Sequence, residues 1–335
     1  MSQHGQDGSF PPSSSEYIRR FRESHDIHDM PLVTPVVLRL LLCFLQDLVG
    51  QVRKMISYNA SGSSRVAATH TSKMLTSIPL DSAAELLQKW YLLAVHRCTE
   101  AATHPTNAAA MVSYRLIFLN TLVCFPDVER LARGDNDHWT AGETTEDPSL
   151  SWKRPHHYDT QNHRQIYFQC GQILHILRNM PEPTRPTWWA GAAYRAALTI
   201  WANSIFTPVD PPASNSSAIN LKQMSKPAMP DALASSSTTS TTSSSTTPIV
   251  VIDALPADDP LLQAYLGGRG APVLSALESS SDPLTLDVPG PILRHLAAFV
   301  GGESGTEVKT DFVRGIRLKL LRLAARWDNR ITRGQ

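Results

Sequence analysis

Two clusters of histidine and aspartate are the residues in this sequence that are best suited to hold a metal ion. The first cluster is His25, Asp26, His28 and Asp29, and the second is His156, His157, Asp159 and His163. Zinc sites need ligands fixed on defined elements, commonly as histidine pairs one helical turn apart. No helix is predicted around the first cluster, and no thiol accompanies either one. Both patterns are more typical of polar, histidine-rich loops, so no metal ligand is assigned.

The cysteines could supply a nucleophile, a disulfide or a zinc ligand. They are Cys43, Cys98, Cys124 and Cys170, each far from the next. Without a Cys-x-x-Cys pair, the spacing excludes a disulfide scaffold, a zinc ribbon and a thioredoxin-type motif. Cys98 follows His96 within a predicted helix, which places the imidazole and the sulfur on different faces. No Gly-x-Ser-x-Gly elbow occurs either. The cysteines are therefore expected to be buried thiols, and no catalytic residue is assigned.

A glycine-rich segment at Gly267–Gly270 is the nearest approach to a phosphate-binding loop. It lacks the Lys and Ser/Thr of a P-loop, and it follows a helix-like segment where a P-loop follows a strand. The pattern indicates a turn that ends a helix. No cofactor-binding residue is assigned, and no cofactor is expected in this chain.

A cationic stripe near the end of the sequence could neutralise nucleic-acid phosphates. Lys319, Arg322, Arg326 and Arg330 recur three or four residues apart in a segment with eight basic and two acidic residues. The alternative is a solvated face of a core-packing helix. The whole chain carries 31 Lys and Arg against 30 Asp and Glu, and it contains no zinc finger, Zn2Cys6 cluster or basic zipper. Direct DNA binding is therefore not favoured.

The 335 residues are 42% hydrophobic and 18% charged, a composition that supports a packed core. The first residues are polar and offer no secretory signal. The longest apolar run, Val36–Leu45, is interrupted by Arg39 and is shorter than the ~20 residues of a spanning helix. We expect an intracellular protein without a membrane partner.

The elements that must position these side chains are mostly helices, because apolar residues recur three and four apart. The pattern predicts helices over 35–58, 106–124, 126–134, 166–180, 187–205, 291–300 and 311–329. A further helix is predicted to begin at Ser82, because Ser82 and Glu85 have the spacing of a capping box. Trp188, Trp201 and Trp327 are expected to fill the core. Ile249–Ile252 predicts a strand that either pairs with Pro272–Leu274 or packs as extended chain. The predicted fold is all-α, an irregular multi-helix bundle with at most one short β hairpin or extended segment.

The predicted domain organisation is one helical domain divided by an insert. Residues 1–30 are expected to form a disordered tail, and 31–207 the first part of the helical domain, with a long loop at 135–160. Residues 208–247 form a disordered insert, since 235–247 are all Ser or Thr and cannot bury apolar area. Residues 248–330 complete the domain.

Four segments in this order resemble the regulatory domain of fungal zinc-finger transcription factors, the fungal-specific transcription factor domain. They are Ala110–Arg133 with its Phe-Pro-Asp-Val-Glu-Arg-Leu-Ala-Arg stretch; Gly171–His175 with Trp188-Trp189 and Tyr194–Ala202; Val251–Pro260 with Pro272–Leu274; and Gly315–Ala324 with Trp327. The resemblance reaches from about Pro35 to Trp327.

This resemblance implies RNA polymerase II transcription regulation in the nucleus through protein contacts, with partners in the transcription machinery, and it allows a homodimer. Members of the family usually place Cys2His2 or Zn2Cys6 fingers ahead of this domain, and none occurs here. Zinc and DNA contacts are accordingly expected only in fingers outside this chain, and the chain is expected not to be an enzyme.

Two alternatives stay open. One is an α-helical enzyme with a pocket near His175, Tyr194 and Arg195, joined by Asp253 or Asp287. The other is a cytoplasmic protein-interaction module. A shared cavity for the enzyme residues would favour the first alternative.

Overall fold

The computed structural model describes residues 13–24, 33–62, 70–97, 105–134, 160–206, 248–277, 282–302 and 310–333. The insert expected at 208–247 lies outside these residues, as does the loop expected at 135–160 apart from Thr160. Both remain predictions.

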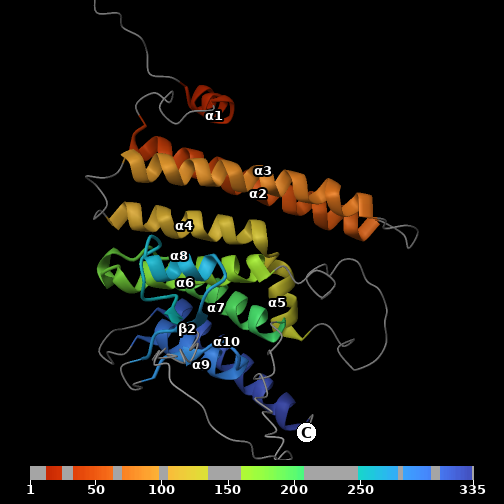
Figure 1. Ribbon diagram of the computed structural model, residues 1–335, viewed down its shortest axis with the longest axis vertical. Coiled ribbons are helices and arrows are strands. Elements are labelled where there is room, and N and C mark those ends of the chain that lie inside the picture. Colours follow the sequence, from red (N-terminus) through yellow and green to blue (C-terminus); the bar gives the residue numbers. More distant parts are fainter. Residues whose placement is uncertain are drawn as a thin grey trace, which may run out of the picture.

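The described residues form ten α-helices, a short 3-10 helix and three short strands (Figure 1). In chain order the elements are α1 Ser14–Glu23, α2 Pro35–Gly62, α3 His70–Arg97, α4 Pro105–Leu122, α5 Phe125–Arg133, α6 Thr160–Asn179, η5 Glu182–Thr184, α7 Trp189–Phe206, β1 Ile249–Val251, α8 Pro260–Leu266, β2 Ala271–Leu274, β3 Leu284–Thr285, α9 Pro289–Gly301 and α10 Asp311–Arg333. The predicted all-α fold class is confirmed, with a small three-stranded sheet beside the helices.

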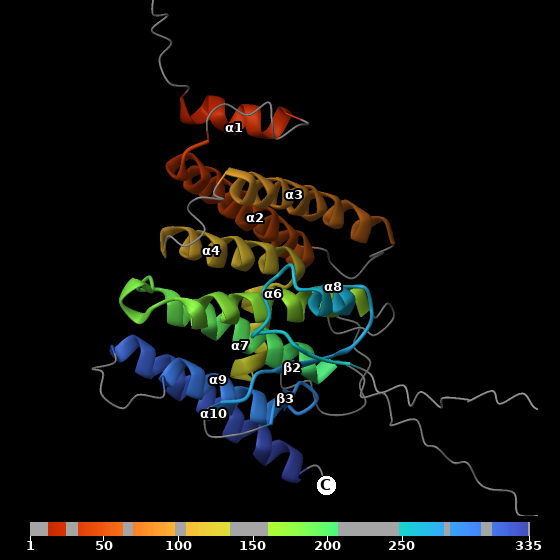
Figure 2. The ribbon, with the colours of Figure 1, turned by 60° about the vertical axis from the view of Figure 1, so that its left-hand side comes forward.

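The helices are stacked in layers (Figure 2). The α2–α3 pair lies above α4, α4 lies above α6, and α7, α9 and α10 lie below α6. Two hydrophobic clusters fill the spaces between them, and α4 contributes to both. Its Tyr114 and Ile117 join the cluster of α1–α3, whereas Val112 and Leu119 join the larger cluster of α5–α10. The fold therefore consists of two cores that share one helix.

Helix α7 lies at the centre of the larger core, and its composition explains why. Ala190, Ala193 and Ala197 are buried, and their small side chains let neighbouring helices approach closely. Trp201 is 1% exposed and meets Trp327 of α10 edge to face, with the ring centroids 5.6 Å apart. The predicted buried stripe of this helix is confirmed, although burial extends around most of its circumference.

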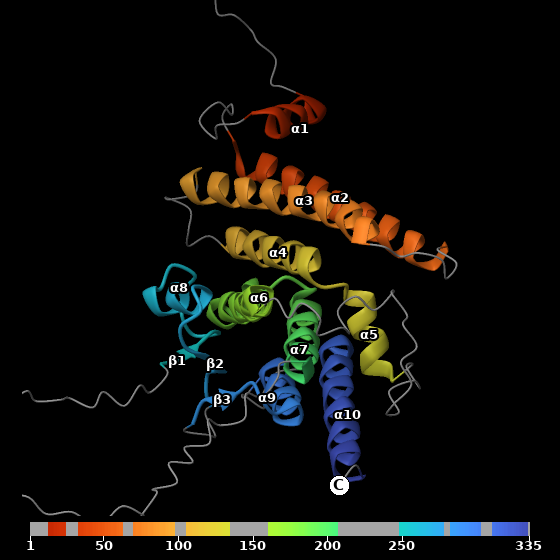
Figure 3. The same ribbon diagram turned by 45° about the vertical axis from the view of Figure 1, so that its right-hand side comes forward.

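A small sheet lies beside α6 and α8 (Figure 3). Strand β1 pairs with β2, the first of the two predicted alternatives, but the pairing is parallel and not that of a hairpin, with Val250 opposite Pro272. Strand β3 pairs antiparallel with β2 through Val273 and Thr285. Strand β3 is not predictable from the sequence, because two residues are too short to show an alternating pattern.

Two predictions about where helices lie are wrong. Residues Ser14–Glu23, expected within a disordered tail, form α1, because Phe21 is fully buried against the α2–α3 pair and Ser13 caps the helix. The helix predicted to begin at Ser82 begins at His70, so Ser82 lies in the helix interior. The apparent capping box is a local pattern that pairing of α3 with α2 overrides (Figure 3).

Among the described residues, Pro35–Tyr58 of α2 is long and apolar enough to cross a membrane by length and composition alone. Core helices pass the same test, and Leu41, Leu45 and Val49 of this segment are fully buried in the α1–α4 cluster. The absence of a membrane partner stays a prediction.

Candidate functional site

The histidine clusters fall mostly outside the described residues. This applies to His25, Asp26, His28, Asp29, His156, His157 and Asp159. His163 lies in α6. Across the described part of the chain, no three His, Cys, Asp or Glu side chains are arranged to hold a metal ion.

Of the described thiols, Cys170 is buried as expected and Cys124 is partly buried, whereas Cys43 is exposed on α2, contrary to the expectation of buried thiols. Burial raises the pKa of the fully buried Cys170 thiol far above its usual range. Burial and a hydrogen bond with Asp127 likewise raise the pKa of Cys124. A raised pKa keeps a thiol protonated and unreactive. Cys98 lies outside the described residues, and its neighbour His96 lies in α3.

The glycine-rich segment ends a helix, as predicted. The N–H of Gly267 donates to the carbonyls of Gln263 and Tyr265 at the end of α8. Gly268 and Gly270 then adopt φ values of +98° and +105°, which favour glycine. The segment leads into β2 and opens no helix, so it offers no helix N-terminus to a phosphate.

The residues named for an enzyme pocket are dispersed. Asp253 is 1% exposed and is fully engaged: its carboxylate forms an ion pair with Arg178 at 2.9 Å and accepts the N–H of Ser275 at 2.7 Å and its hydroxyl at 2.9 Å. His175 lies near the Asp253 backbone, and burial lowers its pKa, which a weaker attraction to Asp253 opposes. This cluster joins α6 to the chain between β1 and β2.

The other three candidates lie elsewhere. Arg195 stacks over the ring of Phe125 of α5 at 5.1 Å, and Tyr194 lies under the ammonium of Lys319 of α10 at 5.9 Å. Asp287 is exposed and accepts a hydrogen bond from Thr285. The structure therefore does not bring His175, Arg195 and an aspartate into one cavity.

The cationic stripe of α10 is partly used within the fold. Arg326 donates to the backbone carbonyls of Ala132 and Arg133, at 2.5 and 3.0 Å, and so caps the end of α5. Lys319 contacts Tyr194 as described above, and Arg322 is exposed. The side chain of Arg330 lies outside the described part. This arrangement fits a solvated face of a core-packing helix better than it fits a row of free cations that binds nucleic acid.

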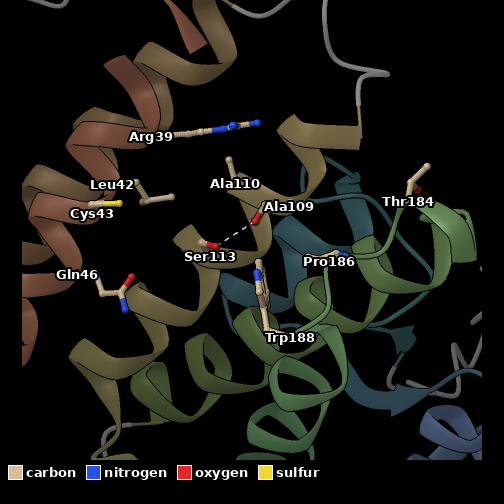
Figure 4. Close-up of a pocket in the computed structure, with 10 residues that line it drawn as sticks. All are labelled: Arg39, Leu42, Cys43, Gln46, Ala109, Ala110, Ser113, Thr184, Pro186 and Trp188. Carbon is tan, nitrogen blue, oxygen red and sulfur yellow. Dashed lines mark hydrogen bonds between the residues drawn. The ribbon is translucent and has the colours of Figure 1, made fainter. Parts of the chain in front are cut away.

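The structure contains a pocket that the sequence analysis did not anticipate (Figure 4). It has a volume of about 390 Å³ and lies where α2, α4 and the segment leading into α7 meet. Its main lining side chains are Arg39, Leu42 and Gln46 of α2, Ser113 of α4, and Pro186 and Trp188. Arg39 is the only charged side chain among the lining residues.

Three structural features shape this pocket. Ala109 and Ala110 of α4 are small, and the Ser113 hydroxyl donates back to the Ala109 carbonyl at 3.1 Å. Helix α2 buries Leu38, Leu41 and Leu45, which leaves Arg39 and Gln46 on its outer side. In Figure 4, Trp188 lies on the side of the pocket away from Arg39. Trp188 is 38% exposed, contrary to the expectation that it fills the core.

The known proteins that are similar to this chain include several fungal transcription factors. The chain is 33% identical over 315 residues to Transcription factor 1 of Elsinoe fawcettii, covering 93% of this chain and 28% of the relative. It is 31% identical over 330 residues to a transcription factor of Zymoseptoria tritici, covering 95% and 30%. It is 28% identical over 314 residues to Transcription factor opdJ of Penicillium oxalicum, covering 87% and 35%. The chain resembles fungal transcription factors over most of its length.

The similarity covers about a third or less of each of these three relatives. No family model matches the chain. No solved structure matches it either.

Proposed function

We propose that this chain is the regulatory region of a fungal zinc-finger transcription factor and acts in the nucleus through protein contacts. The observation that carries the proposal is its similarity over 93% and 95% of its residues to two proteins named transcription factors. The separation of Arg195, which stacks over Phe125, from the cluster of His175 and Asp253 supports the same proposal, because these residues form no shared site for the enzyme alternative. DNA and zinc contacts are then the task of fingers outside this chain.

The surface of the α2–α3 layer supports a role in protein contacts. Met55 and Tyr58 of α2 are 56% and 80% exposed, and Leu92 and Val95 of α3 are 46% and 49% exposed. Within each pair the two residues are three apart on one helix and so share a face, and exposed apolar pairs of this kind suit a surface that binds other proteins. We assign the partner contact to this layer.

A reporter assay tests the proposal. The chain is fused to a foreign DNA-binding domain, and transcription from a promoter with its binding sites is measured in a filamentous fungus. We expect the fusion to change transcription relative to the DNA-binding domain alone. An unchanged promoter with a nuclear, stably expressed fusion would contradict a regulatory role.

A pair of variants tests the assigned surface. Met55→Ser combined with Tyr58→Ser removes exposed apolar area from α2 and is expected to reduce the effect of the fusion at least about threefold. Leu318→Ser on α10 is the control, since Leu318 is also exposed, at 44%, but lies outside the α2–α3 layer. Equal loss in both variants would argue against this surface.

A further inference from the structure

The pocket between α2, α4 and Trp188 joins parts of the molecule that belong to different cores. Leu42 of α2 belongs to the cluster of α1–α4, whereas the segment with Pro186 and Trp188 leads into α7 of the larger cluster. Pockets at such junctions are common sites for small molecules, and about 390 Å³ falls within their usual size range.

The lining has two chemical characters. Leu42, Pro186 and the half-exposed Trp188 indole present apolar surface, and the indole offers a face on which another ring can stack. Arg39 and Gln46 present polar groups from α2. Among the described residues that line the pocket there is no carboxylate, and none of the ion pairs within the described ranges involves Arg39.

A guanidinium beside apolar surface has a definite chemical preference. Arginine binds a carboxylate through two parallel hydrogen bonds, and a charge-assisted bond is stronger than a neutral one. The amide of Gln46 can donate a further hydrogen bond. Arg39 is exposed, so water solvates its charge when no anion is bound, and a neutral or cationic ligand would gain no ion pair there.

We propose that this pocket binds a small aromatic molecule that carries a carboxylate, with the ring against Trp188 and the carboxylate at Arg39. The inference does not depend on the proposed function, because binding is a property of the purified chain. Failure of the reporter assay and failure of the binding test are thus separate results.

The test uses two probes of nearly equal shape, 2-naphthoate and its uncharged amide, 2-naphthamide. Binding to the full chain is measured by isothermal titration calorimetry and by saturation-transfer NMR. We expect saturable binding of naphthoate with at least about tenfold higher affinity than that of naphthamide, the ratio that one charge-assisted hydrogen bond supplies.

Three variants locate the binding site. Arg39→Gln is expected to weaken naphthoate binding about tenfold and to leave naphthamide binding unchanged. Trp188→Ala is expected to weaken both probes, because both lose the stacking surface. Ala109→Leu is expected to abolish both, because the larger side chain enters the pocket. Arg39 and Trp188 are exposed enough to be replaced without unfolding the chain, and circular dichroism checks this for all three.

Lys54→Gln is the matched control, since Lys54 is an exposed cation on the same helix outside the pocket. It is expected to bind naphthoate as the unaltered chain does. The proposal is overturned if neither probe binds at millimolar concentration, if the acid and the amide bind equally, or if Lys54→Gln weakens naphthoate as much as Arg39→Gln does.

Discussion

Arg115 of α4 is a buried cation surrounded by aromatic rings. It is 5% exposed, and its guanidinium lies 5.1 to 5.3 Å from the ring centroids of Tyr91, Tyr114 and Phe168. It donates a hydrogen bond of 3.1 Å to the buried Gln169 side chain, while its Nε has no partner among the described residues. Burial lowers the pKa of Arg115. Because these rings come from α3, α4 and α6, this side chain links the two cores.

The Arg115–Gln169 pair is expected to be strongly non-additive on substitution. Arg115→Met keeps the volume but leaves the buried Gln169 oxygen unsatisfied, which costs about 1–3 kcal/mol of unfolding free energy. Adding Gln169→Met removes the group that was left without a partner. The double variant is therefore expected to lose less unfolding free energy than the two single variants lose in sum, by at least about 1 kcal/mol. Urea unfolding of all four proteins measures this coupling. Simple additivity would mean that the two side chains do not act as a pair.

His295 of α9 is a second buried polar residue, 9% exposed, whose Nε2 has no partner. Burial lowers its pKa, with the nearby Arg178 acting in the same direction and Asp253 opposing it. The unfolded chain therefore takes up this proton at a higher pH than the folded chain does. The buried neutral imidazole therefore contributes fully to stability above the ordinary histidine pKa of about 6.5. This contribution is lost as the pH falls from about 6.5 toward the pKa that His295 has in the folded protein.

We accordingly expect the unfolding free energy to decrease between pH 7 and pH 5.5, and to decrease less in His295→Gln. Urea midpoints across this range measure both slopes. His96→Gln is the control, since His96 lies on the exposed side of α3. An identical slope for His295→Gln and the unaltered chain would show that this imidazole does not contribute.

At the scale of the elements, the approach of α6 to the end of β1 depends on one missing side chain. A Cβ at Gly171 would lie 2.8 Å from the carbonyl carbon of Ile252 and 2.9 Å from its Cβ, and closer still to its carbonyl oxygen. Backbone atoms cannot yield as a flexible side chain can. By contrast, a Cβ at Gly50, inside α2, would meet nothing within 4 Å.

The two glycines are expected to respond to alanine with opposite signs. Gly171→Ala should destabilise the protein by about 1–3 kcal/mol through overpacking. Gly50→Ala should stabilise it by about 0.5–1 kcal/mol, because alanine has the higher helix propensity. Thermal unfolding followed at 222 nm distinguishes them. A stabilised Gly171→Ala would mean that α6 and β1 do not approach as closely as described.

At the scale of the whole molecule, the two cores differ in how firmly their helices are held. Helix α1 is anchored by one buried side chain, Phe21, and by Lys89 of α3, which donates to carbonyls of Phe21 and Ser24. Helices α6 and α7 are enclosed by the larger cluster. Local opening should therefore begin at α1 and reach α6 and α7 only on global unfolding.

Phe21→Ala is expected to release α1 alone. Amide hydrogen exchange within 14–23 should rise at least about tenfold, while amides of α6 and α7 keep their protection. Arg22→Ala, at an exposed position of the same helix, serves as the control. Faster exchange throughout the molecule in Phe21→Ala would instead indicate that both cores open together.

Much of this fold follows from local sequence. Apolar spacing predicted α4, α6, α9 and α10 closely, and Pro126 and Gly134 correctly marked the limits of α5, where Gly134 adopts φ of +78°. The β-branched run at 249–252 predicted β1, and it left open whether this strand pairs with 272–274 or packs as extended chain. Each of these features depends on residues that are neighbours in the sequence, so it can be predicted from the sequence without knowledge of the tertiary contacts.

The errors and omissions share one cause, which is contact between distant segments. Ser82 has the residues of a helix start, yet α3 continues through it beside α2. Trp188 has the composition of a core residue, yet it lines a pocket. Arg39 interrupts an apolar run in the sequence, and only folding places it across from Trp188. Local chemistry thus determined most of the segments that form helices, whereas packing of distant helices decided that α1 folds and where the helix ends, the buried charges and the pocket lie. The reason is that burial depends on neighbours that spacing along the chain does not specify.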